Sequence, residues 1–503
     1  MNHVLNGLAA NPALPSALVD RLIAVADADL VPDLAARPDL SRAQVLALAA
    51  RLEEAAVQLA YDGRLAADDV EPVAQPDAAL ALLDQGADRP HWARLLANDP
   101  LVERREKLAA CPDLPLDVAQ LLAVDRDIRV VAELALWTTP DVATRLAHHP
   151  HAEVRRSVAA NEATPPQVLA ALLTGQGLPP AQSCLVCDSA AIPFLHDPYG
   201  PRPECDLPPG ASCDGSHQST VHETQQNALR NPSTPPSAVV GFAGHPSVLL
   251  RCELAARPDL PPDVYAQLAH DPVPMVRAQI AGNPAIDAAL IRSLADDRGH
   301  DVQRRLAHQP ALPLDLLTHL AGTTRLGSRL LPRIVAASPS EIEELAASPS
   351  PTVRMLLAQR RDLPTGVRDA LARDSDAKVL KSIAPHPGLS EAQLRAMVQQ
   401  HGIRVLAKVA TNPDATPALL EDLSRHQPPA QKAFREIARH HRATAAALLA
   451  CLSDRQARPI AAVHPALRPA VIVGLLADND WQVVEGAAAN PSLPLSAMAD
   501  LLP

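Results

Sequence analysis

Four of the seven cysteines lie close together in the sequence, at a spacing typical of a metal site. Two residues separate Cys184 from Cys187, and Cys205 and Cys213 follow. Two thiolates at this spacing can approach one metal ion from a tight turn, and two further thiolates complete a four-ligand shell. The surrounding segment has few core-forming residues, so a bound metal would order it. Disulfide bonds, or free thiols in a disordered insertion, are the alternatives.

The cysteine spacing leaves the kind of metal centre open. Tetrahedral zinc takes four cysteines or mixtures of cysteine and histidine, although the seven residues between Cys205 and Cys213 are more than a zinc knuckle usually has. An iron–sulfur cluster is also held by four thiolates, and its spacing rules are looser. Both centres therefore stay candidates at this point.

A short motif at the last of these cysteines favours an iron–sulfur cluster. The run Cys213-Asp214-Gly215-Ser216-His217 resembles the signature of CDGSH iron–sulfur domains, in which that cysteine and histidine ligate a two-iron cluster and a helix follows. The resemblance implies that His217 is a fifth candidate ligand. The Cys-x-Cys pair of those domains is missing, so Cys184 and Cys187 would supply the other ligands. The alternative is a turn whose side chains cap the following helix.

No pattern in the sequence indicates catalysis. The chain has no glycine-rich phosphate loop, no Gly-x-Ser-x-Gly elbow and no His-Glu-x-x-His motif. Its histidines are scattered along the chain near expected turns, where they would serve as turn and helix-capping residues. We therefore expect a protein that is not an enzyme.

Outside the cysteine-rich segment, the chain is organised by a recurring corner that reads Asn-Pro or a close variant. The corner prolines Pro232, Pro258, Pro284 and Pro310 stand 26 residues apart. A fixed period of this length indicates stacked supersecondary units rather than one globular core. Each unit reads as a helix opened by proline, a second corner and a second short helix. Helices this short need their neighbours for stability.

These units resemble the leucine-rich repeat variant family, whose repeat runs Asn-Pro-x-Leu-Pro, a leucine-rich helix, Leu-Ala-x-Asp-Pro and Val-Arg-x-x-Val-Ala. The segments 268–284, 96–115 and 476–494 follow this pattern closely, and the resemblance covers most of the chain outside 175–226. It implies a right-handed solenoid in which α-helices alternate with 3₁₀-helices. At least one member of the family carries an iron–sulfur cluster beside its repeats.

Five arginines occupy one position of the repeat, seven residues before the corner proline or its equivalent. Stacking would place them in a row that could bind an acidic peptide or a phosphate backbone. We favour the alternative that each arginine ties its repeat to a neighbour by pairing with corner carboxylates, because a consensus residue usually serves the repeat. The five are Arg105, Arg155, Arg251, Arg277 and Arg354.

Composition narrows the functions further. Aromatic residues make up only 2% of the chain, so alanine, leucine and valine must build its core. A net charge of -12 argues against general binding to nucleic acid. The longest apolar run, Ala445 to Leu452, is too short to span a membrane, and no secretory signal begins the chain. Seven unevenly spaced cysteines are typical of a reducing compartment. We expect a cytoplasmic protein without a membrane partner.

The sequence thus predicts an all-α solenoid of about 26-residue repeats, in residues 1–174 and 227–503, interrupted by a cysteine-rich insert at 175–226. Our first hypothesis is a non-enzymatic scaffold that binds a protein or peptide, with an insert stapled by an iron–sulfur cluster or, alternatively, zinc. The second is a redox or iron-responsive protein whose cluster state is read through the solenoid. Binding of nucleic acid along the arginine row is disfavoured by the net charge.

Overall fold

The computed structural model describes residues 3–189, 213 and 215–502, and within them the chain is helical. These residues form 36 α-helices and two short 3₁₀-helices, with no strand in the described ranges. The predicted all-α solenoid is therefore confirmed. The chain divides into two compact units, one made of residues up to 65 together with those from 321 onward, the other of residues 66–320. The three-part division predicted from the sequence stays a prediction.

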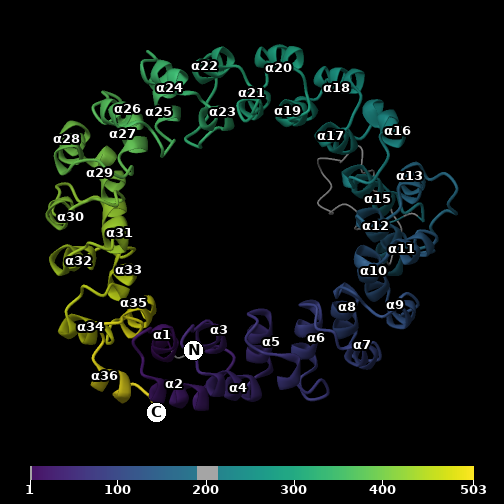
Figure 1. The fold of residues 1–503 in the computed structure, drawn as a ribbon, viewed down its shortest axis with the longest axis horizontal. Helices are drawn as coiled ribbons and strands as arrows, with labels where there is room; N and C mark the ends of the chain where they lie inside the picture. Colours follow the sequence, from purple (N-terminus) through teal and green to yellow (C-terminus); the bar gives the residue numbers. More distant parts are fainter. Residues whose placement is uncertain (1–2, 190–212, 214, 503) are drawn as a thin grey trace. The chain divides into compact units, whose positions relative to one another are not determined.

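In each unit, the first helices of the repeats form one row and the second helices another (Figure 1). In the unit of residues 66–320, the second helices are α6 (Pro76–Asp84), α8 (Val102–Ala110), α10 (Ile128–Trp137), α12 (Ala152–Ala160), α15 (Gln218–Arg230), α17 (Val248–Ala256), α19 (Pro274–Gly282) and α21 (His300–Leu306). The first helices are α7 (Pro90–Leu96), α9 (Leu116–Leu122), α11 (Pro140–Leu146), α13 (Pro166–Thr174), α16 (Pro236–Val239), α18 (Pro262–Ala269), α20 (Ala288–Ala295) and α22 (Leu314–Thr323).

The other unit has the same two rows. Its second helices are α1 (His3–Ala10), α3 (Val31–Ala35), α5 (Glu53–Tyr61), α23 (Pro332–Val335), α25 (Pro351–Leu357), α27 (Ala377–Ile383), α29 (Ile403–Ala410), α31 (Gln431–Arg439), α33 (Arg458–Val463) and α35 (Trp481–Ala488). Its first helices are α2 (Ser16–Val25), α4 (Arg42–Arg51), α24 (Pro339–Ala346), α26 (Thr365–Leu371), α28 (Glu391–His401), α30 (Pro417–Ser424), α32 (Ala445–Cys451), α34 (Pro469–Leu475) and α36 (Leu495–Asp500).

The repeat of α18 and α19 shows how the sequence produces this unit. Pro262 opens α18, where its missing N–H leaves no hydrogen bond unmade. Leu268 on α18 and Ile280 on α19 are fully buried, and the packing of such apolar residues between the two rows makes the core. The alternation of α-helix with 3₁₀-helix that the family resemblance implies is not the rule here. Among the described residues, 3₁₀-helix is limited to η1 (Ala67–Asp69) and η2 (Val240–Gly244).

The corner asparagine joins each repeat to the one before it. The side-chain amide of Asn283 donates to the carbonyl oxygens of Ala255 and Arg257, at 2.8 and 2.7 Å, and its Oδ1 accepts from the N–H of Ala285. Carbonyls at a helix end have no partner inside the helix, so the corner side chain satisfies them. The same pair of bonds to the preceding repeat is made by Asn161, Asn231, Asn412 and Asn490.

The first repeat is stacked on the last by the same device. Helix α1 packs against α35 within their shared unit, and the Asn11 amide donates to two carbonyls of the last repeat, at 2.9 and 2.8 Å. Gly7 makes this approach possible, since a Cβ there would lie 2.3 Å from the backbone oxygen of Glu485. The two ends of the described chain are thus neighbouring repeats.

Across the described residues, none of the helices combines the length and the apolar character that crossing a membrane requires.

Candidate metal centre

The cysteine-rich insert does not interrupt the stack of repeats. Helix α15 packs on α12 as the next second helix, and Asn231 donates to the carbonyls of Ala159 and Asn161 at 3.1 and 2.8 Å. The last bond joins residues 70 apart, whereas the equivalent bond from Asn283 joins residues 26 apart. The extra residues therefore lie, along the chain, between α13 and α15.

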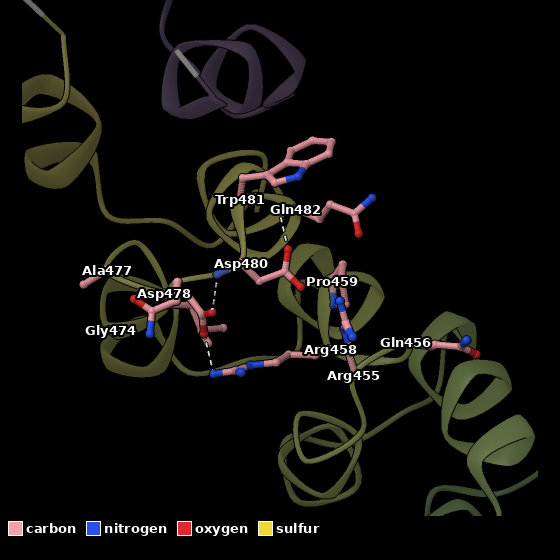
Figure 2. A pocket seen from close by; sticks show the side chains of 12 residues that line it. Arg455, Gln456, Arg458, Pro459, Gly474, Ala477, Asp478, Asp480, Trp481 and Gln482 are labelled. Atoms are coloured by element: carbon pink, nitrogen blue, oxygen red, sulfur yellow. Dashed lines mark hydrogen bonds and ion pairs between the residues drawn. The ribbon is translucent and has the colours of Figure 1, made fainter. Parts of the chain in front are cut away.

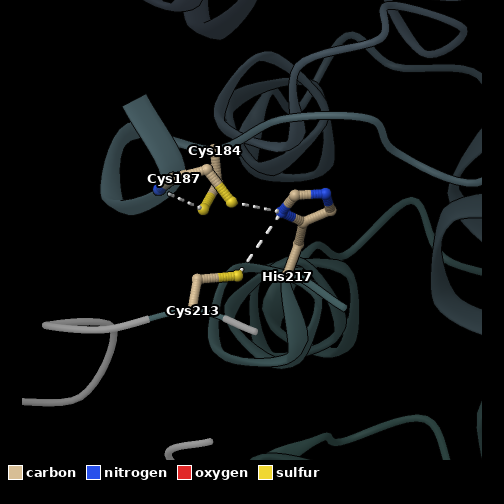
Figure 3. Close-up of side chains that lie close together, drawn as sticks. All are labelled: Cys184, Cys187, Cys213 and His217. Carbon is tan, nitrogen blue, oxygen red and sulfur yellow. Dashed lines mark hydrogen bonds between the residues drawn. The ribbon is translucent and has the colours of Figure 1, made fainter. Parts of the chain in front are cut away.

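Four of the predicted ligands meet where the insert leaves and re-enters the array (Figure 3). The ligand atoms of Cys184, Cys187, Cys213 and His217 all lie within 4.8 Å of one another. The Nδ1 atom of His217 lies 3.3 Å from the Sγ of Cys187 and 3.6 Å from that of Cys213. All of the four except Cys187 are buried. The fifth candidate, Cys205, lies outside the described residues.

Tight turns place these ligands. The N–H of Cys187 donates to the Sγ of Cys184 at 3.4 Å, at the start of α14 (Leu185–Ser189), and the N–H of Gly215 donates to the Sγ of Cys213 at the same distance. Gly215 and His217 both have positive φ, of 90° and 53°. The left-handed conformation costs a residue with a Cβ about 1–2 kcal/mol. At His217 it accompanies the turn that places the ring beside the sulfur atoms.

The thiols of this cluster differ in acidity. Burial raises the pKa of the Cys187 thiol to about 12. Burial also acts to raise the pKa of Cys213, but hydrogen bonds from the Gly215 N–H, the Cys187 thiol, the His217 N–H and the Cys184 thiol together outweigh it and lower that pKa below its ordinary value. A thiolate is the form that binds metal. The backbone around Cys213 is therefore arranged to favour the ligating form.

The metal site is docked on helix α12. The N–H of Ala152 donates to the carbonyl of Ser183 at 2.9 Å. Directly before the helix, the Nε2 atom of His151 lies 3.1 Å from the carboxylate of Asp188. Residues on both sides of the cysteine pair are thus fixed to the repeat. The sequence reasoning missed His151 and Asp188, because they are far apart along the chain and belong to no motif.

Two of the distances between the ligand atoms, both from His217, fit a single bound ion. Zinc lies about 2.3 Å from sulfur and about 2.0–2.1 Å from nitrogen, so the ligand atoms of a tetrahedral site are roughly 3.5–3.8 Å apart. The two sulfur–nitrogen distances of 3.3 and 3.6 Å are close to this value. The three cysteines and the histidine can therefore bind a metal ion.

The arginine row has the contacts that the structural alternative predicts. Four of its five members pair with an aspartate twenty residues further along the chain. These pairs are Arg105–Asp125, Arg251–Asp271, Arg277–Asp297 and Arg354–Asp374, with shortest distances of 2.6–2.7 Å. Arg155 instead donates to the carbonyls of His149 and Pro179, the second of which lies in the insert. A role of these arginines in binding a partner stays a prediction.

The same pairing is visible in a hollow of about 1150 Å³ beside α33 and α35 (Figure 2). Arg458 pairs there with Asp478, and the Asp480 carboxylate accepts from the N–H of Gln482. The exposed ring of Trp481 stacks on His3 at a centroid distance of 4.5 Å. The side chains of Arg458, Asp478 and Asp480 are thus used in contacts inside the protein.

Among the comparisons with known proteins, matches come from solved structures. Neither a family model nor a curated protein sequence matches the chain. One matching solved structure is a leucine-rich repeat variant. It is 16% identical, covers 54% of this chain and 87% of its own, and has a TM-score of 0.30. An engineered protein matches with 16% identity over 89% of this chain and 91% of its own, at a TM-score of 0.17.

A third match is a structure of the Pds5–Scc1 complex, with 13% identity over 96% of this chain and 68% of that one, at a TM-score of 0.15. At such identities the likeness concerns the fold alone.

Proposed function

We propose that this protein is a non-enzymatic scaffold that binds a protein or a peptide along its stacked repeats. The observation that carries the proposal is the uninterrupted stack, which continues past the insert through Asn231. Arrays of this kind present long, regular surfaces that suit extended partners. The cytoplasmic location expected from the sequence belongs to the same proposal.

Selection from a displayed library of random peptides tests this function. The full chain is immobilised, and peptides are recovered after washing and are then titrated against the chain in solution. We expect a small set of related sequences that bind with saturation. Failure to enrich any sequence over an immobilised unrelated helical-repeat protein would contradict the scaffold function.

For the insert we propose a zinc ion that acts as a structural staple. This proposal is supported by the short distances between the four ligand atoms, which all lie within 4.8 Å of one another. A two-iron cluster binds its ligands through two metal atoms, so the ligands of different iron atoms lie further apart. When bound, such an ion supplies no reaction and only fixes its ligands. It would join Cys184 and Cys187, where the insert leaves the array, to Cys213 and His217, where it returns. The second candidate function is a redox or iron-responsive protein, which requires an iron–sulfur cluster at this site. Its support is the CDGSH-like motif at Cys213.

Metal analysis with a ligand variant separates these two candidates. We expect a colourless protein with about one zinc per chain, and loss of that zinc in Cys213→Ser. Because the Asn231 bonds bypass the insert, the variant should keep its helical circular dichroism while proteases cut residues 175–217 faster. Cys252→Ala, which removes a buried thiol outside the site, is the control and should retain zinc. A brown protein that contains iron and acid-labile sulfide would establish the second candidate instead.

A further inference from the structure

Lysine is rare in this chain and is concentrated in one region. The chain has five lysines, and four of them stand at positions 378, 381, 408 and 432. The pairs between repeats use arginine, whose planar fork suits two parallel hydrogen bonds to a carboxylate. A lysine is instead a flexible, hydrated point charge. The lysine cluster is therefore not explained by the contacts that hold the array together.

Three of these lysines line one cavity. The cavity has a volume of about 760 Å³ and is formed by residues of α27, α29 and α31 with the segment before α31. Its cations are Lys381, Arg404, Lys408 and Lys432. In contrast to four of the five arginines of the row, none of these four cations pairs with a carboxylate of the described chain. Four positive charges thus share one hollow without internal compensation.

The carboxylates that the repeat places beside other second helices are missing here. Asp374 and Asp376 precede α27, and Asp376 caps that helix. The residues 26 positions later, before α29, are Gln400 and Gly402. Neither α29 nor α31 has a side-chain cap at its first turn. Free N–H groups and the positive helix end therefore add to the charge of the lysines.

The cavity also has an apolar part. Ile403, Ala407, Pro429 and Ala430 line it, and Ile403 is 48% exposed. No aromatic ring lies among the lining residues, so unpaired bases would have no surface on which to stack. Cations around a small apolar floor are complementary to carboxylates that flank an apolar side chain.

We propose that the cavity between α27, α29 and α31 binds an acidic peptide segment of a partner protein. Its carboxylates would pair with Lys381, Lys408 and Lys432, and one apolar side chain would lie on Ile403 and Ala407. The inference rests on the proposed scaffold function and deepens it, because it names the surface and the chemistry of the partner.

Fluorescence anisotropy with a defined peptide tests the assignment. The probe is a labelled peptide of aspartate and glutamate residues around a central leucine, and the receptor is the full chain. We expect saturable binding that rising salt weakens. The variant Lys381→Glu, Lys408→Glu, Lys432→Glu should weaken it by about tenfold or more. Replacing the central leucine of the probe with serine should weaken it by at least about threefold.

A matched control carries the same change of charge elsewhere. The exposed residues Arg361, Arg373 and Arg468 do not line the cavity, and their joint replacement by glutamate should change the affinity by less than about twofold. Equal losses in both variants, or no loss in the lysine variant, would refute the site. An oligodeoxythymidylate that binds more tightly than the peptide and loses affinity in the lysine variant would reassign the cavity to nucleic acid.

Failure of the lysine cavity as a binding site can be distinguished from failure of the scaffold function. Peptides selected from the random library that bind the lysine variant as tightly as the unchanged chain would leave the scaffold function standing and refute this cavity as its site. A library that yields no peptide would refute the scaffold function itself. Lys408 and Lys432 are exposed and Lys381 is half-buried, and circular dichroism of the variant verifies that the helices persist.

Discussion

Replacement of Arg251 by alanine is expected to lower the local free energy of unfolding by about 3–5 kcal/mol. The side chains of Arg251 and Asp271 are only 10% and 5% exposed, and their atoms meet at 2.6 and 3.2 Å. Arg251 also donates to the carbonyl of His245. Its removal leaves the Asp271 carboxylate buried without its cation, and this uncompensated charge accounts for most of the expected loss.

Native-state hydrogen exchange in α17 and α19 measures this loss, because a long array need not unfold as one unit. The control is Arg94→Ala, which breaks a pair with Asp117 of similar length, 2.7 Å, whose side chains are 54% and 58% exposed. Exposed pairs contribute little to stability, because water and salt screen their charges. A loss at Arg251 no larger than that at Arg94 would show that the row is not a set of structural ties.

Acidification from pH 7 to pH 5 should destabilise the repeats whose corners carry histidine. The Nε2 atoms of His386, His440 and His464 lie 2.8–3.1 Å from carbonyl oxygens of the preceding repeat. In the last two, Nδ1 accepts a backbone N–H, so the ring has no place for a second proton. Burial accordingly lowers the pKa of all three.

The direction of the pH effect follows from these lowered pKa values. In the unfolded chain the histidines take up protons below their ordinary pKa of about 6.5, while in the folded chain they remain neutral to lower pH. Stability is therefore complete above about pH 6.5 and falls below it, by up to about 1.4 kcal/mol per pH unit for each histidine. Three histidines give an upper limit of about 4 kcal/mol per pH unit.

The triple variant His386→Asn, His440→Asn, His464→Asn tests this assignment. Other repeats have asparagine at the same corner with the same acceptors, as Asn412 and Asn490 show. The variant should match the unchanged chain at pH 7.5 and lose much less stability at pH 5. Hydrogen exchange in α29, α31 and α33 provides the measurement. The same loss of protection in both proteins would mean that other groups cause the acid sensitivity.

The sequence predicted the repeat well because its signals are local. Prolines that open helices and apolar residues at helical spacing act within one unit, so the period could be read without the structure. The sequence did not predict that the corner asparagine also binds the preceding repeat. Asn283 looks like the end of a helix, and only the stacking shows that its amide reaches Ala255, 28 residues earlier.

The cysteine cluster and the lysine cavity also differ in how far the sequence predicts them. The motif around Cys184 and Cys213 predicted a cluster of side chains that could hold a metal, because these residues follow one another closely in the chain. The sequence carries one sign of the lysine cavity, which is the concentration of lysines between residues 378 and 432. Their meeting at one cavity depends on how α27, α29 and α31 stack, and no local pattern contains that information.

The contact between the first and last repeats gives this array an unusual order of folding. The corner bonds of Asn283 join residues 28 and 26 apart, whereas the bond from Asn11 to Asn490 joins residues 479 apart. The entropy of closing a loop grows with its length, so this contact should form after the others. Repeat arrays ordinarily lose their terminal units first. Here those two units cover each other, so neither the first nor the last described repeat is a free terminal unit.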